Sequence, residues 1–355
     1  MALPGRFHAL DLLRLLAACL IALMHFEAHI WRWPGAPRHF AGLVMAADFF
    51  FVLSGFVMCH HLGGTLPARG VPDFLRRRLA RIWPLHVLTM LLWVAGMLLV
   101  QWGRPERSQW ARIDGGEIVA HLFLVQAWGV TGRVGLNQVS WSVSAEWFCY
   151  LLFPLLLPVM RRGSAWVALL LALAFLLLLE VGLPAAGLVP WPVRTHDWGA
   201  IHALPGFCLG MAAWRVWQEW RPAIGWSMAV AAALLLLALL LVAAPAWLTL
   251  LVSLLVVLGF AAAESRQPLS PSRARAFGWW GDLSYGVYLW HPLVILLTLV
   301  AASGSTMRDP VLGLWGTVAV GAVLTLLVAW AGFHWFERPA RNWMSGLRVS
   351  SGRTA

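Results

Sequence analysis

The sequence predicts an all-α membrane protein, a polytopic bundle of about ten transmembrane helices with both termini in the cytoplasm. Three observations predict this fold class. The 355 residues are 61% hydrophobic and only 12% charged, far from the composition of a soluble domain. The apolar residues form runs long enough to cross a bilayer. The arginines, which supply every basic side chain other than histidine, gather in the short connections between those runs.

Ten apolar runs have about the length that a membrane-spanning helix needs. We expect spans at 10–30, 41–61, 83–101, 141–160, 164–180, 200–217, 223–242, 246–263, 283–303 and 311–333. They form one membrane domain over residues 1–345 and leave 346–355 as a short cytoplasmic tail. Segment 117–130 is too short to cross, so we expect it to form an interfacial or re-entrant helix.

The arginines also predict the orientation of the chain. With the N-terminus inside, 17 of the 26 lie in cytoplasmic connections and 8 lie outside, as the positive-inside rule requires. The formal net charge of +11 is therefore a topology signal that faces membrane lipids, and we expect no nucleic-acid partner. The four cysteines lie inside apolar runs and are expected to pack as small residues. HFEAH is not the zinc motif H-E-x-x-H, and we predict no metal site.

The first span carries two polar residues that lipid disfavours, Arg14 and His25. Such groups are costly at this depth and usually serve a function. They are 11 residues apart, which is close to three helical turns, so both lie on one face, roughly 16 Å apart along the helix axis. We expect a cation near one leaflet and a base deeper in the membrane.

Three further ionisable residues lie within other spans: Asp48 and Glu146 in the outer parts of the second and fourth, and His291 near the middle of the ninth. A carboxylate beside an imidazole orients it and raises its basicity. We therefore interpret His25, Asp48 and Glu146 as candidate catalytic residues, with His291 and Trp141 as candidate substrate contacts. The alternative for the ionisable residues is a hydrogen bond that holds helices together, and for Trp141 an interfacial belt.

The stretch FLRRRLARIWP places a cluster of arginines just before the third span. Arg78 and Arg81 are three residues apart and share a helix face. Such a pair binds phosphate groups in bidentate fashion. The alternative is a plain topology signal that contacts anionic lipid headgroups.

Several stretches together resemble the acyltransferase type-3 family of integral membrane acyltransferases. Each motif is short, and their joint order and spacing from about residue 6 to 341 carry the resemblance. One departure is Ala46-Ala47 where the family usually has Gly-Val before Asp48. The matching stretches are LDLLRLLAACLIALMHF, ADFFFVLSGF, FLRRRLARIWPLH, WSVSAEWFCYLLFP, LSYGVYLWHPL and WFERPAR.

The resemblance implies an O-acyltransferase of the bacterial cytoplasmic membrane. Its donor would be cytoplasmic acyl-CoA, with acetyl as the expected group, and its acceptor a hydroxyl of a cell-envelope glycan or lipid-linked saccharide. Arg14 and His25 match the family's essential pair, Arg78 and Arg81 its inner arginine motif, and Glu146 its motif acid. Arg14, Arg78 and Arg81 would then bind the donor.

Two other functions stay open at this point. The same chemistry on a small molecule such as a macrolide would need the same residues. A proton-coupled transporter or exporter would use intramembrane charges as a proton relay. Transporters often contain repeated halves, and the sequence shows no such repeat, which favours the enzyme. Neither the acyl group nor the oligomeric state follows from the sequence.

Overall fold

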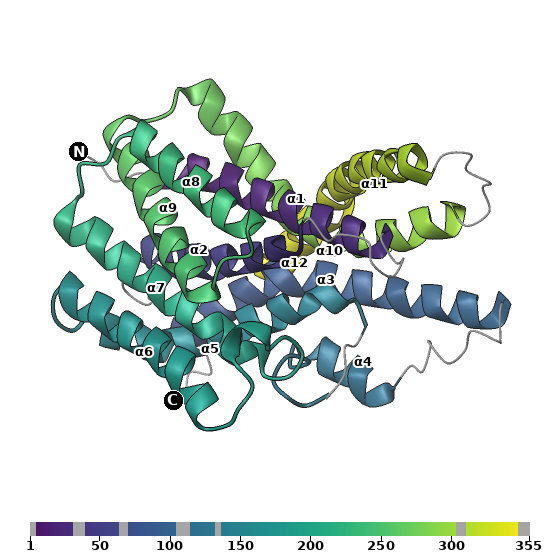
Figure 1. The fold of residues 1–355 in the computed structure, drawn as a ribbon, viewed down its shortest axis with the longest axis horizontal. Helices are drawn as coiled ribbons and strands as arrows, with labels where there is room; N and C mark the ends of the chain where they lie inside the picture. Colours follow the sequence, from purple (N-terminus) through teal and green to yellow (C-terminus); the bar gives the residue numbers. More distant parts are fainter. Residues whose placement is uncertain are drawn as a thin grey trace.

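The computed structural model describes residues 5–30, 40–63, 70–103, 114–131, 136–302 and 310–346. These residues fold into helices and contain no strand, which confirms the all-α prediction (Figure 1). The helices are α1 (His8–Ile30), α2 (Ala46–His61), α3 (Gly70–Gly103), α4 (Gly115–Leu122), α5 (Trp141–Arg161), α6 (Ala165–Ala185), α7 (Gly199–Trp220), α8 (Trp226–Leu241), α9 (Ala246–Arg266), α10 (Pro271–Ala302), α11 (Pro310–Gly332) and α12 (Arg338–Gly346).

Four short elements join these helices: η1 (Ala41–Met45), η3 (Gln138–Ser140), η4 (Trp191–Val193) and the π-helical η5 (Phe333–Glu337). Each of the ten predicted spans corresponds to a helix. Among the described residues, seven helices are long and apolar enough to cross a membrane, and α8 is apolar but shorter. The count of ten spans and the sides on which the termini lie stay predictions. Most of the predicted tail, 347–355, lies outside the described residues.

Two close helix pairs form the centre of the bundle, α1 against α10 and α2 against α7. Glycines allow the second approach. A Cβ added at Gly55 of α2 would lie 2.0 Å from the Phe207 carbonyl oxygen, and one at Gly210 of α7 would lie 1.9 Å from the Val52 carbonyl oxygen. Membrane helices commonly pack through such small residues, so α2 is held tightly against the core.

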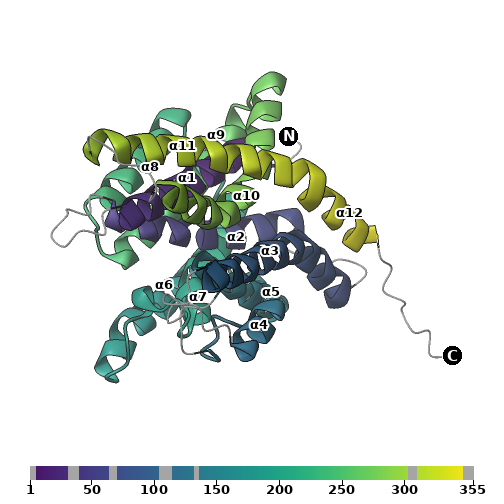
Figure 2. The same cartoon turned by 90° about the vertical axis from the view of Figure 1, so that its right-hand side faces the viewer.

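The periphery is built from the more exposed helices. In Figure 1, α3 extends from the middle of the molecule toward the right of the view and α11 lies near α10, while Figure 2 shows α11 continuing toward α12. The two yellow helices α11 and α12 join through η5, and α12 packs against α3. This return of the C-terminal helices to α3 brings η5 close to the arginine-rich start of α3.

The predicted helix at 117–130 is wrong in its second half. Helix α4 ends at Leu122, and Leu124 adopts a left-handed backbone with φ 58°. The chain then turns against α5, where the Ser144 hydroxyl donates to the Leu124 carbonyl oxygen (2.7 Å) and accepts from the Ala127 N–H (3.1 Å). These bonds replace the helical ones, and Leu124 and Ala127 are fully buried.

Candidate active site

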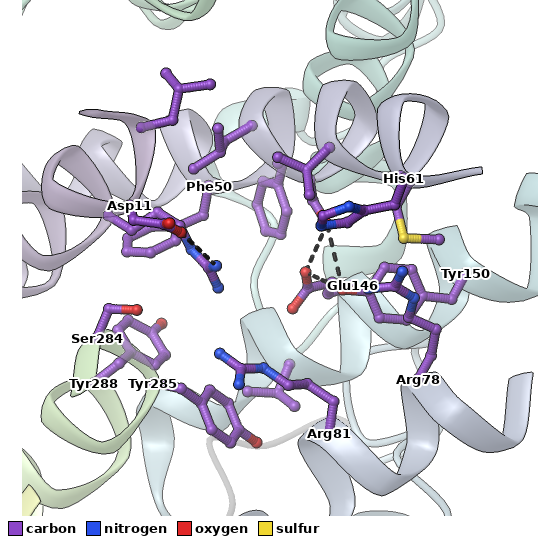
Figure 3. Close-up of a pocket in the computed structure, with 18 of the residues that line it drawn as sticks. Asp11, Phe50, His61, Arg78, Arg81, Glu146, Tyr150, Ser284, Tyr285 and Tyr288 are labelled. Atoms are coloured by element: carbon purple, nitrogen blue, oxygen red, sulfur yellow. Dashed lines mark hydrogen bonds and ion pairs between the residues drawn. The ribbon is translucent and has the colours of Figure 1, made fainter. Parts of the chain in front are cut away.

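A cavity with a volume of about 400 Å³ lies among α1, α2, α3, α5 and α10. Five arginines line it, so we call it the arginine chamber: Arg6, Arg14, Arg78, Arg81 and Arg341. Figure 3 shows Arg78 and Arg81 from α3 facing a space that Asp11, Glu146 and Tyr285 also border. The structure thus brings together Arg14, Arg78 and Arg81, the three residues predicted to bind an acyl-CoA donor.

The arginine cluster of α3 divides into two faces. Arg76 and Arg77 both pair with Asp73, and Arg76 also donates to the Met344 carbonyl oxygen near the end of α12 (2.7 Å). Arg76 thus connects α3 to α12, while the Arg77 pair stays within α3. Arg78 and Arg81, in contrast, line the cavity, which agrees with their predicted shared face.

The cavity arginines differ in how far their charge is compensated. Arg81 lies 3.7 Å from Glu337 Oε1. The Arg78 guanidinium lies 5.8 Å from the ring centres of both Phe74 and Tyr150, and it forms no ion pair with the described residues. The Arg78 guanidinium is therefore available for a charge-assisted hydrogen bond to an incoming anion.

Helix α1 contributes a linked set of charges to the same chamber. Asp11 pairs with Arg6 and lies 3.9 Å from Arg14 Nη1, while Arg6 reaches Asp282 on α10 (3.0 Å). Both carboxylates engage Arg6, so neither is positioned to neutralise Arg78. Asp282 and Glu337 thus each pair with a nearby arginine, Arg6 and Arg81.

Glu146 belongs to the arginine chamber. Its Oε1 accepts hydrogen bonds from the Ser54 hydroxyl (2.7 Å) and from the Tyr150 hydroxyl (2.5 Å). Tyr150 in turn lies under Arg78. Glu146 therefore stabilises the wall beside the available guanidinium.

A second, smaller cavity of about 100 Å³ adjoins the first. Three histidines line it, His25, His121 and His196, so we call it the imidazole chamber. Ala47 and Tyr288 line both cavities, so the two chambers meet at these residues. The predicted substrate contact Trp141 also lines this chamber.

His25 is held by His291, the other predicted substrate contact. The two rings are stacked with centres 5.1 Å apart, and His291 Nε2 lies 3.1 Å from His25 Nδ1. His291 Nδ1 faces the Val287 carbonyl oxygen (3.2 Å), which only accepts, so Nδ1 carries the proton. In the neutral pair His291 Nε2 then accepts from His25 Nδ1, and the lone pair of His25 is on Nε2.

The boundary between the chambers is fixed by the Tyr288 hydroxyl. It donates to the Val139 carbonyl oxygen (2.9 Å) and accepts from the Ser142 hydroxyl (2.7 Å). The opposite wall is Ala47, whose side chain is a single methyl group. The two hydrogen bonds therefore hold the Tyr288 side chain in place where the chambers meet.

The expectation that Asp48 or Glu146 contacts His25 is wrong. Asp48 Oδ1 accepts from His202 Nε2 (2.7 Å), and Glu146 bonds Ser54 and Tyr150. Asp48 and His202 line neither chamber. The imidazole that orients His25 is His291, which was predicted only as a substrate contact.

The Asp48–His202 pair supports one wall of the imidazole chamber. His202 Nδ1 donates to the Arg194 carbonyl oxygen (2.8 Å), which fixes the segment carrying Thr195 and His196. The His202 ring also lies against Trp141, with ring centres 5.0 Å apart. The pair thus connects α2 to two parts of the chamber lining.

Sequence reasoning missed three residues of this region: His202, Tyr288 and His121. His202 lies in a predicted span, and the signal was the same as for His25, a titratable group within an apolar run. Burial lowers the pKa of the His121 imidazole, so this wall residue is neutral at pH 7. Among the described residues there is no group of three or more metal-ligating side chains.

Comparison with known proteins identifies the family of the chain. Residues 7–334 match the model of a family described as an acyltransferase domain. The chain belongs to this acyltransferase family. No solved structure matches the chain.

Two relatives show how far the similarity of this acyltransferase extends. Acyltransferase MdmB of Streptomyces mycarofaciens is 38% identical over 120 residues, which is 33% of this chain and 29% of that protein. Protein 2 in picA locus of Rhizobium radiobacter is 39% identical over 155 residues, 40% of this chain and 78% of that protein. The match therefore spans less than a third of MdmB.

Proposed function

We propose that this protein is a membrane O-acyltransferase that moves an acyl group, with acetyl as the expected one, from cytoplasmic acyl-CoA to a hydroxyl of a cell-envelope glycan or lipid-linked saccharide. The observation that carries the proposal is the pair of adjoining chambers, one rich in arginine and one holding the His25–His291 pair. Family membership supports acyl transfer as the reaction.

The arginine chamber suits the donor because CoA carries several phosphate groups. Arg14, Arg78 and Arg81 offer guanidinium groups in a partly enclosed space, where charge-assisted hydrogen bonds are strong. The pantetheine arm would extend from there toward the junction at Tyr288. The roughly 16 Å between Arg14 and His25 along α1 is about the reach of such an arm.

His25 is the proposed general base, and His291 is the residue that positions it. His25 Nε2 takes the proton of the acceptor hydroxyl as its oxygen attacks the thioester carbonyl. The new C–O bond forms, the C–S bond breaks, and the CoA thiolate leaves and receives the proton. This scheme uses no acyl-enzyme intermediate.

The two predicted carboxylates take other roles in this scheme. Glu146 orders the donor-side wall through Ser54 and Tyr150. Asp48 acts through His202, as a positioning residue for the acceptor side. Neither exchanges a proton with the substrate.

The test measures transfer of radiolabelled acetyl from acetyl-CoA by membranes. Membranes that contain the wild-type protein are compared with membranes that contain His25→Ala or Arg14→Ala at matched expression. Label in the envelope glycan with the intact protein alone supports the proposal. Full transfer by correctly inserted His25→Ala contradicts it. Movement of unmodified solute without acyl-CoA turnover would favour a transporter instead.

A further inference from the structure

Two residues that line the imidazole chamber, Gln126 and Asn137, have a side-chain carbonyl oxygen to which no described residue donates a hydrogen bond. Gln126 Nε2 donates to the Ser140 carbonyl oxygen (3.1 Å), and Asn137 Nδ2 donates to the Thr89 hydroxyl oxygen (3.2 Å). Because each NH₂ group is engaged, the orientation of each amide is set. Gln126 Oε1 and Asn137 Oδ1 are both buried without a hydrogen-bond partner.

Such oxygens need an explanation in a well-packed protein. Buried polar atoms are nearly always hydrogen-bonded, and a carbonyl left without a donor loses the interaction it had with water. Asn137 also has a left-handed backbone, with φ 45°, a conformation that asparagine adopts more readily than most residues. Both side chains are almost fully buried, at 4% and 2% exposure, so bulk water does not supply the donors.

The rest of the chamber suits an uncharged ligand. Its described lining contains amides, hydroxyls, imidazoles, the Trp141 ring and several aliphatic side chains, and none of these described residues is an aspartate, a glutamate or an arginine. Neutral His121 fits this pattern. Aromatic faces stack on apolar faces of rings, while amide oxygens accept from hydroxyl groups.

We propose that the imidazole chamber receives an uncharged, hydroxyl-rich ring of the acceptor, a neutral sugar unit, whose hydroxyls donate to Gln126 Oε1 and Asn137 Oδ1 while the ring lies against Trp141. This inference rests on the proposed function and names the chemistry of its acceptor. An ionised carboxylate or phosphate offers mainly acceptor oxygens. Beside Gln126 Oε1 and Asn137 Oδ1 these oxygens would find no donor, and the anion would lose its bound water without compensation. An anionic unit is therefore rejected at this position.

The deciding experiment identifies the sugar that receives the acyl group. Membranes of the organism that encodes the protein are incubated with [¹⁴C]acetyl-CoA, and the labelled oligosaccharides are released and sequenced by tandem mass spectrometry. We expect the acetyl ester on a neutral sugar unit. An ester on a uronic acid or a phosphorylated sugar overturns this inference and leaves the proposed function standing. Absence of label from every fraction contradicts the proposed function and, with it, this inference.

Two variants test the amide oxygens themselves. Gln126→Met removes the acceptor while keeping the side-chain length, and Asn137→Gly removes it while keeping the left-handed backbone. We expect each to lower transfer to the glycan roughly tenfold, the equivalent of one lost hydrogen bond. Acetyl-CoA affinity, measured on the same preparations, should stay unchanged and reports correct folding.

The matched control is Gln218→Met, which makes the same substitution at an exposed position near the end of α7. It should transfer at the wild-type rate. Wild-type transfer by both Gln126→Met and Asn137→Gly would show that the oxygens do not bind the acceptor.

Discussion

The arginine chamber and the imidazole chamber share two residues but differ in charge, size and origin of their side chains. The first is larger, at about 400 Å³ against about 100 Å³, and collects five arginines. The second collects imidazoles and amides. In the proposed scheme this difference lets one helix, α1, meet the donor at Arg14 and the acceptor at His25, because about three helical turns separate the two residues.

The largest expected effect comes from removing the base of the imidazole chamber. His25→Ala should lower acyl transfer roughly 10²- to 10⁴-fold, the range typical of a general base. Because His25 is distant from the arginine chamber, acetyl-CoA affinity should stay within about twofold of wild type. Transfer rates and equilibrium binding on detergent-purified protein check both statements, and a parallel loss of affinity would contradict the separation of the chambers.

Asp48→Asn tests the support behind the same chamber. It leaves His202 without its carboxylate in a site where Asp48 is 1% exposed, and breaking a buried ion pair costs about 3–5 kcal/mol. We expect the free energy of unfolding in detergent to fall by that order. Asp197→Asn is the control, since the Asp197 side chain is 54% exposed in its pair with Arg194 and such pairs contribute about 0–1 kcal/mol. Equal losses in the two variants would refute a structural role for the Asp48–His202 pair.

Arg78→Ala tests the arginine chamber. Its guanidinium has aromatic neighbours and no ion pair with described residues. A bound phosphate would therefore not compete with a carboxylate for the charge-assisted hydrogen bond to Arg78. We expect acetyl-CoA affinity to fall roughly 10- to 100-fold. Arg77→Ala removes the adjacent charge, which pairs with Asp73 at 54% side-chain exposure, and should change the affinity by about twofold or less. Similar losses in both would indicate a general effect of positive charge.

The smallest effect is expected at the junction. Tyr288→Phe removes the hydroxyl that donates to Val139 and accepts from Ser142, a loss of about 1 kcal/mol. Transfer should fall about fivefold, with acetyl-CoA affinity retained. Steady-state rates at varied acetyl-CoA check this, and a large rise in the KM for acetyl-CoA alone would assign Tyr288 to donor binding.

The parts of the site that lie on one helix could be predicted from the sequence. Helical periodicity places Arg14 and His25 on one face of α1, and it places Arg78 and Arg81 on one face of α3. All ten predicted spans lie in helices because long apolar runs have few other conformations in lipid. The extra turn after α4 could not be predicted, since it depends on Ser144 of another helix.

The pairings between helices were the other part that the sequence could not supply. Asp48 lies 154 positions from His202 in the chain, and His25 lies 266 from His291. No local pattern fixes which of several intramembrane polar groups meet. The sequence therefore indicated the residues of the site better than their partners, and the carboxylates expected beside His25 serve elsewhere.

The most direct test of the two-chamber account asks from which side the donor enters. Inside-out and right-side-out membrane vesicles receive [¹⁴C]acetyl-CoA from outside, and label in the glycan is measured with wild type and with Arg78→Ala. The account predicts transfer in inside-out vesicles alone, where the arginine chamber faces the donor, and its loss at low donor concentration in Arg78→Ala. Equal transfer in sealed right-side-out vesicles would contradict it.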